Sequence, residues 1–162
     1  MDTTEILIKI RKIVRSINLE SKKIQKEHGV SIPQILCLQF LRNSTNYQAG
    51  QGEIRKFLNL NSSTASGIIN RLETKGLVAR LPKRGDKRTV TIALTSKGDQ
   101  LMQEIPSLLH EQLTEKLENL DDSTLENIQT SLELLEKLLE LDHMEASPLI
   151  ANDDFTDASL NN

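Results

Sequence analysis

The apolar residues of this chain recur every three or four positions almost throughout, and the period changes to two in one place, between Leu77 and Leu94. A spacing of three or four places side chains on one face of an α-helix, whereas strict alternation places them on one face of a β-strand. The two alternating runs, LVARL and TVTIAL, flank PKRGDKR, in which Pro82 and Gly85 favour a turn. The pattern therefore predicts a mainly α-helical fold that carries a small β-hairpin.

Capping and turn residues divide the sequence before the hairpin into helices. A long amphipathic helix occupies the first 28 residues, and Gly29 suits its C-terminal cap. The next expected helices cover about residues 31–41, 51–58 and 62–75, with a polar loop, RNSTNYQAGQG, after the first of them. Ser31 suits the N-cap of the 31–41 helix, Asn61 or Ser62 that of the 62–75 helix, and Gly76 the end of the latter.

After the hairpin the helical period returns. Ser96 can cap a helix that continues to Leu117, with a kink expected at Pro106. The segment NLDDST then starts a last amphipathic helix, and from Asp142 the chain is polar and acidic, which predicts a disordered tail. The expected organisation is an N-terminal helix, a central domain, C-terminal helices and an acidic tail, at residues 1–28, 29–95, 96–141 and 142–162.

Charge is strongly polarised along the chain. The net charge is -3, but residues 1–50 carry +4, residues 51–100 carry +6, and residues 101–162 carry -13. Basic residues are densest in the hairpin, where five of them lie within nine positions against a single acid, Asp86: Arg80, Lys83, Arg84, Lys87 and Arg88. This distribution favours a middle region that meets an anion and a C-terminal region that stays away from it. Chance clustering on solvated faces is the alternative.

The helix expected over residues 62–75 has two unlike faces. Its apolar stripe comprises Ala65, Ile68, Ile69 and Leu72. The opposite side is small and polar, and comprises Ser62, Ser63, Thr64, Ser66, Gly67, Asn70 and Arg71. A solvated helix face usually carries Glu and Lys, so small polar residues indicate close approach to another surface. That surface can be a ligand such as DNA, or a sheet of the same protein.

The order of helix, turn, polar-faced helix and basic hairpin is that of a winged helix-turn-helix. A helix fits the major groove of DNA, and small polar side chains let it reach the base edges. A hairpin with Arg near its tip can reach the adjacent minor groove, where negative potential is focused. Asp86 can hold the Arg88 guanidinium extended through a bidentate pair. The sequence thus predicts binding to double-stranded DNA.

The stretch INRLETKGLVARLPKRGDKRTVTIALTSKG contains three short motifs: Leu-Glu-x-x-Gly-Leu at residues 72–77, Asp-x-Arg at 86–88 and Leu-Thr-x-x-Gly at 94–98. It is preceded by GVSIPQILCLQFL. In these segments the chain resembles the MarR family of winged helix-turn-helix transcriptional regulators, and the resemblance covers about residues 5–141. The longer stretch is similar to the second half of that family's domain, and GVSIPQILCLQFL is similar to its second helix. Two positions depart from the pattern: Arg55 stands where a small Ala is usual, and Gly67 where a larger polar or basic residue is common.

The resemblance implies a homodimer held together by the first and last helices, whose apolar stripes are too long for one small core to cover. It implies a regulator, in most members a repressor, that reads a pseudo-palindromic operator and is released by a small-molecule effector or by oxidation. The residues expected at the DNA are the polar face of the 62–75 helix, the wing residues Lys83, Arg84, Asp86, Lys87 and Arg88, and Arg55 as a phosphate contact.

Other chemistry finds little support in the sequence. Cys37 lies among core positions of the second helix, so we interpret it as a small apolar residue rather than a redox sensor. His28, His110 and His143 are widely separated and predict surface histidines, with no metal site and no cofactor. Tyr47 can line a pocket or cover apolar surface. No catalytic grouping, signal peptide or membrane-spanning run is apparent, which predicts a cytoplasmic protein without enzyme activity.

Two alternatives to a sequence-specific regulator stay open at this stage. A winged helix can bind another protein instead of DNA, and such a module would need no basic wing. It would also expose apolar residues on the outer face of the 62–75 helix, where the sequence has none. The other alternative is an architectural DNA-binding protein that responds to no ligand.

Overall fold

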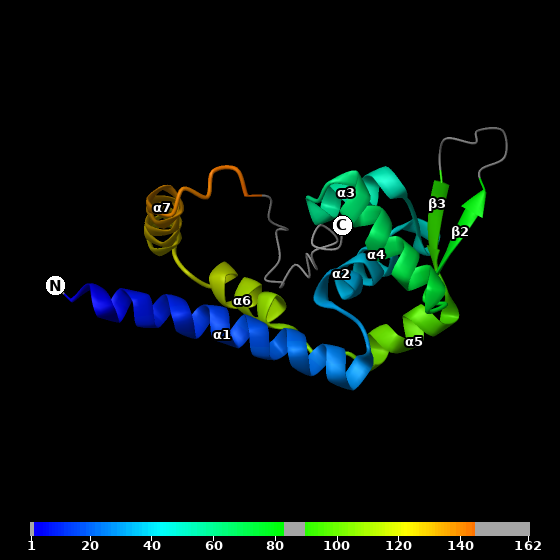
Figure 1. Cartoon of the computed structure of the whole chain (residues 1–162), viewed down its shortest axis with the longest axis horizontal. Coiled ribbons are helices and arrows are strands. Elements are labelled where there is room, and N and C mark those ends of the chain that lie inside the picture. The colour runs from blue at the N-terminus through cyan, green and yellow to red at the C-terminus, as the bar shows by residue number, and fades with distance from the viewer. Residues whose placement is uncertain (1, 83–89, 145–162) are drawn as a thin grey trace, which may run out of the picture.

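The computed structural model describes residues 2–82 and 90–144, and within them the chain is mainly helical with one small sheet (Figure 1). The elements follow in the order α1 (Thr3–His28), α2 (Ile32–Arg42), η1 (Thr45–Tyr47), β1 (Gln48–Gly50), α3 (Gln51–Leu58), α4 (Ser62–Thr74), β2 (Val78–Pro82), β3 (Val90–Leu94), α5 (Ser96–Glu104), α6 (Leu109–Glu118) and α7 (Asp122–Leu138). This is the winged helix-turn-helix architecture that the sequence predicts.

The hydrophobic core belongs to residues 30–94, which we call the winged unit. Among the buried apolar residues described, only Ile24 and Leu108 lie outside it. α2 is the central element, with contacts to α3, α4, α5 and the sheet. Except for the half-buried Phe40, its apolar residues are buried on every side, whereas α3 and α4 each bury one stripe. Phe40 and Phe57 stack at 4.5 Å between ring centroids at the border of this core.

The sheet has three antiparallel strands in the order β1-β3-β2. Val78 pairs with Leu94 and Pro82 with Val90, which confirms the predicted hairpin stem. β1 pairs with β3 through Ala49 and Ile92. The prediction of a polar loop over RNSTNYQAGQG was therefore wrong at Gln48–Gly50, which form a third strand. A strand of three residues is too short to show alternation.

Local chemistry explains where α1, α2 and α4 begin and end. Gly29 and Gly76 both have positive φ, 71° and 74°, the conformation that ends a helix and that favours glycine. Ser31 and Gln34 form a capping box at the start of α2. The side chain of Asn61 accepts from the backbone N–H of Thr64 at 2.9 Å, so Asn61 is the N-cap of α4.

The chain after the hairpin differs from the prediction in two respects. Thr95, not Ser96, caps α5: its hydroxyl accepts from the Gly98 N–H at 3.1 Å and donates to the Gly76 carbonyl at 2.7 Å. The expected kink at Pro106 is a complete break between α5 and α6, because Ile105 is already extended. Gly98 is required here, since a Cβ on it would lie 2.3 Å from the carbonyl oxygen of Leu77.

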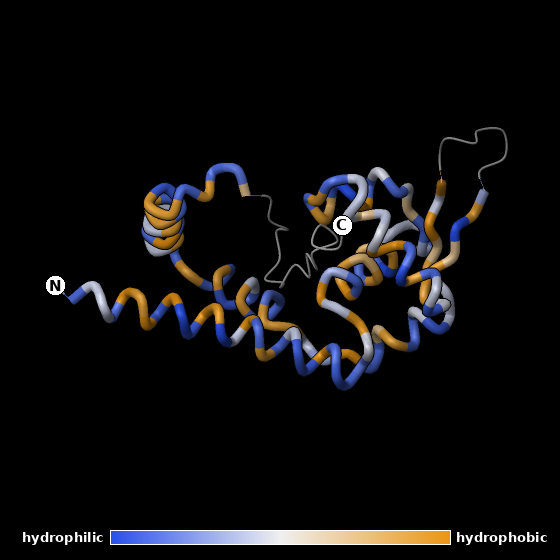
Figure 2. The backbone as a smooth tube through the Cα atoms, viewed as in Figure 1, coloured by the Kyte–Doolittle hydropathy of each residue, from blue (hydrophilic) through white to orange (hydrophobic). Residues whose placement is uncertain are grey.

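α1, α6 and α7 form a second region, which we call the helical arm. It extends away from the winged unit, and apolar segments recur along α1 and α7 (Figure 2). Ile13 on α1 is 57% exposed and Leu132 on α7 is 54% exposed. Other large apolar side chains exposed on the arm are Ile6, Leu7, Ile8, Val14, Leu19, Leu113, Ile128, Leu134 and Leu138. In the described part of the chain, no helix is long and apolar enough to cross a membrane.

Candidate nucleic-acid interface

α4 rests on the core through four residues and turns its other side outward. Its buried residues are Ala65, Ile68, Ile69 and Leu72, the stripe that the sequence predicts. The opposite ridge contains Ser63, Gly67, Asn70 and Thr74, which follow one another at spacings of three or four. Burial of the apolar stripe therefore fixes the rotation of α4 about its own axis, and in this rotation the polar ridge faces away from the core.

The predicted site residues of α4 lie on or beside this ridge. Ser62, Ser63, Asn70 and Arg71 are exposed, whereas Thr64, Ser66 and Gly67 are half-buried. A Cβ added to Gly67 would meet nothing within 4 Å. The protein itself does not require a glycine here, and the gap leaves the middle of the ridge low and open.

Several side chains of the ridge are held by neighbours. The Gln51 side-chain amide at the start of α3 donates to the Ser66 hydroxyl at 2.7 Å. The Ser63 hydroxyl donates to the Asn61 side chain at 2.9 Å. Asn70 accepts from Arg80 of β2, which also pairs with Glu73. Helical periodicity within α4 does not reveal Gln51, Glu73 and Arg80 as supporting residues, because it says nothing about contacts between α4 and side chains of α3 and β2.

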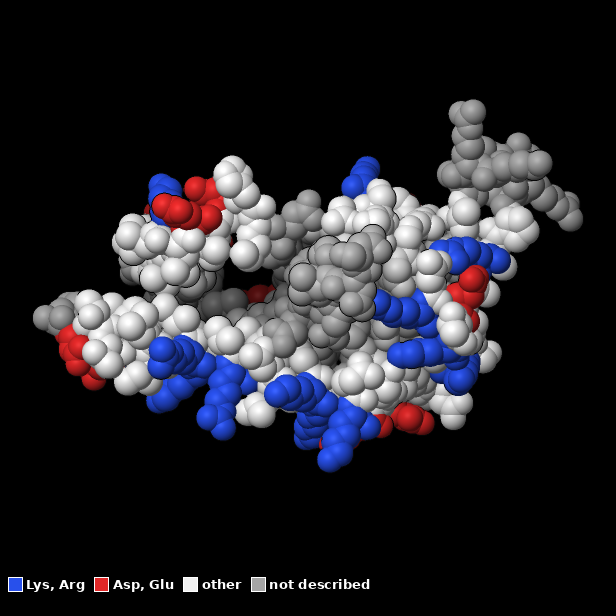
Figure 3. Space-filling view, in the orientation of Figure 1, with Lys and Arg blue, Asp and Glu red and all other residues white. Residues whose placement is uncertain are grey.

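The predicted wing residues Lys83, Arg84, Asp86, Lys87 and Arg88 lie outside the described residues. In the sequence they lie between Pro82 and Val90, which form the last described pair of the stem of β2 and β3. Arg55, the expected phosphate contact, is half-buried on α3. Lys and Arg side chains gather on the side of the molecule that carries α4, β2 and α5, and again along one edge of α1 (Figure 3).

Cys37 and the histidines occupy different environments. Cys37 is buried in α2, and burial raises the pKa of its thiol to about 12, so the prediction that it belongs to the core is confirmed. His143 is exposed, as expected. The prediction of a surface position for His110 was wrong: it is 6% exposed on α6. No cluster of three or more potential metal-binding side chains exists within residues 2–82 and 90–144.

His110 belongs to a polar junction where the arm meets α2. Glu20 of α1 accepts from the backbone N–H of Leu109 at 2.7 Å, and Glu111 accepts from the Gln39 side chain at 2.8 Å. Burial lowers the pKa of His110, and nearby Glu111 partly opposes this effect. Burial raises the pKa of Glu20, although its hydrogen bond from Leu109 acts in the other direction.

A cleft of about 340 Å³ lies where the end of α1 meets α4 and α5. Its lining combines apolar side chains with polar and charged ones: His28, Gly29, Val30, Lys75, Leu77, Lys97, Gln100, Leu101 and Glu104. The Lys75 ammonium donates to the carbonyl of Gly29, and the Lys97 ammonium donates to the carbonyl of Lys75 at 2.9 Å. Burial, followed by the neighbouring Arg71 charge, lowers the pKa of Lys75.

Residues 30–90, which run from the start of α2 to the first residue of β3, match the model of the MarR family. Over this segment the chain is similar to the MarR family, the family that its sequence motifs resemble. The relatives that it matches are named as transcriptional regulators, not as enzymes.

Comparisons with individual proteins extend the likeness beyond the winged unit. The uncharacterized HTH-type transcriptional regulator YsmB of Bacillus subtilis is 28% identical over 126 residues, which cover 76% of this chain and 83% of the relative. The transcriptional repressor MprA of Escherichia coli is 26% identical over 131 residues, or 79% of this chain and 72% of the relative. The crystal structure of Sco3205, a MarR family regulator from Streptomyces coelicolor in complex with DNA, shares the fold with a TM-score of 0.60 and 19% identity, over 86% of this chain and 91% of that one.

Proposed function

We propose that this protein is a homodimeric repressor that binds a specific, pseudo-palindromic sequence of double-stranded DNA. The observation that carries the proposal is the outer ridge of α4, which is small and polar and is open at Gly67, where no described residue lies within 4 Å of an added Cβ. In this proposal α4 lies in the major groove, and its exposed polar side chains contact base edges. The basic wing residues, Lys83 to Arg88, enter the adjacent minor groove.

Exposed apolar stripes on the helical arm support the homodimer. Isolated apolar side chains on a surface are ordinary, but a series of large ones along α1 and α7 is typical of an interface. A second copy offers the same stripes, so a twofold arrangement buries both sets. The dimer would present two copies of α4 to half-sites about one helical turn, roughly 34–36 Å, apart.

The relative MprA is named a transcriptional repressor, which supports repression as the mode of regulation. The Sco3205 crystal contains DNA, which supports DNA as the target. A dimer bound over a promoter represses simply by occupying it.

We assign the effector to the cleft between α1, α4 and α5. Its lining includes the apolar side chains of Val30 and Leu101 and the lysines Lys75 and Lys97. This combination suits a small organic anion.

The test is fluorescence anisotropy with the DNA upstream of the protein's own coding region and a scrambled duplex of equal length, across a salt series. Tight binding to the native duplex alone, weakening steeply as salt rises, is the expected result, because phosphate contacts release counterions. Equal, weak binding to both duplexes would contradict sequence specificity, and no binding at low salt would contradict the DNA function itself.

Arg88→Ala is the matching variant for the wing. If Arg88 contacts the groove, its loss should weaken binding by about 1–3 kcal/mol, and the dimer should persist in analytical ultracentrifugation. Unchanged DNA affinity in this variant would remove Arg88 from the interface while leaving the role of α4 in place.

A further inference from the structure

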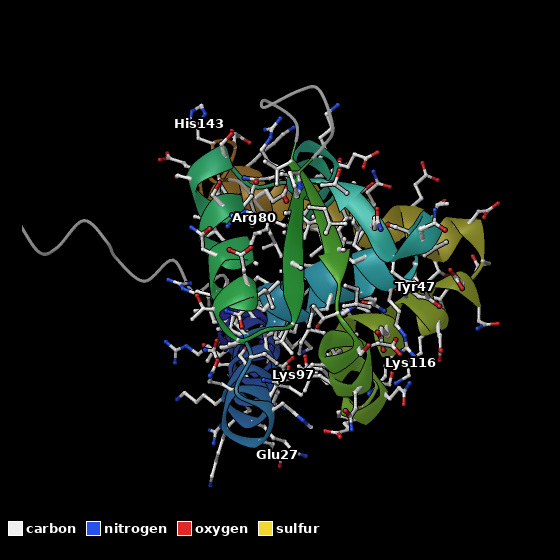
Figure 4. The ribbon with its side chains drawn as sticks, turned by 90° about the vertical axis from the view of Figure 1, so that its right-hand side faces the viewer. Glu27, Tyr47, Arg80, Lys97, Lys116 and His143 are labelled. Atoms are coloured by element: carbon white, nitrogen blue, oxygen red, sulfur yellow. The ribbon has the colours of Figure 1, made fainter. Side chains whose placement is uncertain are left out.

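Arg80 connects the second strand to the outer ridge of α4. One guanidinium nitrogen donates to Oδ1 of Asn70 at 2.5 Å, and another donates to Oε1 of Glu73 at 3.0 Å. The other carboxylate oxygen of Glu73 accepts from the backbone N–H of Arg80 at 3.3 Å. Glu73 thus holds both the strand and the guanidinium, and the guanidinium in turn holds Asn70. Figure 4 shows Arg80 beside α4.

This contact decides which way the Asn70 amide points. A guanidinium has donors and no acceptor, so the Asn70 atom beside it must be the oxygen. The two N–H groups of the amide then face away from Arg80. Asn70 lies in the exposed ridge between Gly67 and Thr74. The Thr74 hydroxyl donates to the backbone carbonyl of Asn70 and not to its side-chain amide. The side chain of Asn70 therefore offers donors to whatever approaches the ridge.

The orientation matters because an Asn side chain recognises adenine with both its amide N–H group and its amide oxygen. The usual bidentate contact donates to N7 and accepts from the 6-amino group, so it needs the amide oxygen. Here Arg80 takes one of the two lone pairs of that oxygen, and its positive guanidinium beside the oxygen disfavours the approach of a second donor such as the 6-amino group. Guanine presents two acceptors in the major groove, N7 and O6, and matches a group that only donates.

We propose that Arg80 is a positioning residue that sets base preference: by engaging the Asn70 oxygen, it makes Asn70 select guanine over adenine. This inference rests on the proposed DNA function. Arg80 itself touches no base in this arrangement and acts through Asn70. Ser66 and Ser63 are held by other partners, Gln51 and Asn61, so the influence of Arg80 is confined to the base pair that Asn70 meets.

The experiment selects binding sites from randomised duplexes with the full-length protein and three variants. Wild type should favour guanine at one position of each half-site. Arg80→Met removes the donors, frees the Asn70 oxygen and should shift the ratio of adenine to guanine binding there by roughly tenfold or more. Arg80→Lys keeps a donor and a charge and should retain the guanine preference. Asn70→Ala should abolish discrimination at that same position.

Arg71→Met is the charge control, since it removes one positive charge from α4 and leaves Arg80 and Asn70 unchanged. It should weaken DNA binding without changing the base preferred at the position that Asn70 meets. An unchanged preference in Arg80→Met, with Asn70 still required at that position, would overturn the proposal. So would a preference that shifts equally in Arg71→Met.

A measurement without DNA separates this inference from the proposed function. Side-chain coupling constants of Asn70 in the free protein should report a single rotamer in wild type and rotamer averaging in Arg80→Met. Averaging in wild type would overturn the positioning role regardless of DNA binding. A single rotamer together with no DNA binding would instead contradict the function. If Arg80→Met fails to fold, Glu73→Gln weakens the same link and should shift both readouts in the same direction.

Discussion

The winged unit and the helical arm are built from equally amphipathic sequences, yet they reach different degrees of burial. In the winged unit the apolar stripes of α2, α3 and α4 converge with β3 on one core. In the arm, α7 has no buried residue in the described structure, and α1 has one, Ile24, near its junction with α2. The same helical pattern therefore completes a core within the winged unit, whereas in the arm it leaves apolar stripes exposed, which the proposed dimer would bury.

The difference separates two kinds of stability. Packing of the winged unit is intramolecular, so its contribution does not depend on protein concentration. In the proposed dimer, burial of the arm stripes requires a second copy, so its contribution follows mass action and weakens on dilution. Substitutions in the two regions should accordingly differ in their concentration dependence even when their energies are similar.

The largest effect is expected for Leu132→Asp on α7. In the proposed dimer this side chain becomes buried, and an unpaired charge in an interior costs about 3–5 kcal/mol. The dissociation constant of the dimer should rise at least about a hundredfold. Sedimentation equilibrium over a dilution series would measure it.

Two controls show whether the effect is specific to the interface. Thr130→Asp adds the same charge to the opposite, polar side of α7 and should leave the dimer intact. Leu38→Ala removes buried volume from the winged unit and should cost about 2–5 kcal/mol, by the same amount at every protein concentration. A Leu132→Asp protein that remains dimeric would place the subunit contact away from this stripe.

A smaller effect, of opposite sign for folding and for binding, is expected for Gly67→Ala. Alanine is about 0.5–1 kcal/mol more favourable than glycine inside a helix, and nothing lies within 4 Å of the added Cβ. The free energy of unfolding should therefore rise. DNA affinity should fall by about 1–3 kcal/mol, the usual cost of overpacking a close contact.

Gly52→Ala on α3 is the matched control for this change. Gly52 also has no atom within 4 Å of an added Cβ, and it lies on the helix before the ridge. It should gain folding stability and keep the wild-type DNA affinity. If Gly67→Ala binds DNA as well as Gly52→Ala does, α4 does not approach its target closely at Gly67.

The predictions from sequence succeeded where one element contains its own signal. Each of three features of α4 depends on residues only a few positions apart: its apolar stripe, its N-cap at Asn61 and its end at Gly76. The structure contains all three. β1 escaped prediction because a three-residue strand is defined only by its partner, β3, more than forty residues later. Burial of His110 and the hold of Arg80 on Asn70 depend in the same way on contacts between separate elements.

The smallest expected effect concerns pH and the junction between the two regions. His110 is buried on α6, and its Nδ1 has no hydrogen-bond partner among the described residues. Burial lowers its pKa, so the folded state favours the neutral imidazole more than the unfolded state does. This contribution to stability is present above the ordinary pKa of about 6.5 and is lost as the pH falls below it.

The raised pKa of Glu20 acts with the opposite sign. Its contribution is complete below the ordinary value near 4.5 and is lost as the pH rises through the folded-state pKa, so Glu20 partly offsets His110 between these limits. Comparing variants removes this overlap. His110→Gln keeps a polar side chain without the titration, and its melting temperature should fall less than that of wild type between roughly pH 7.5 and 5.5. Equal falls in the two proteins would mean that His110 gains its proton as easily in the fold as in the unfolded chain, and that the junction tolerates the charge.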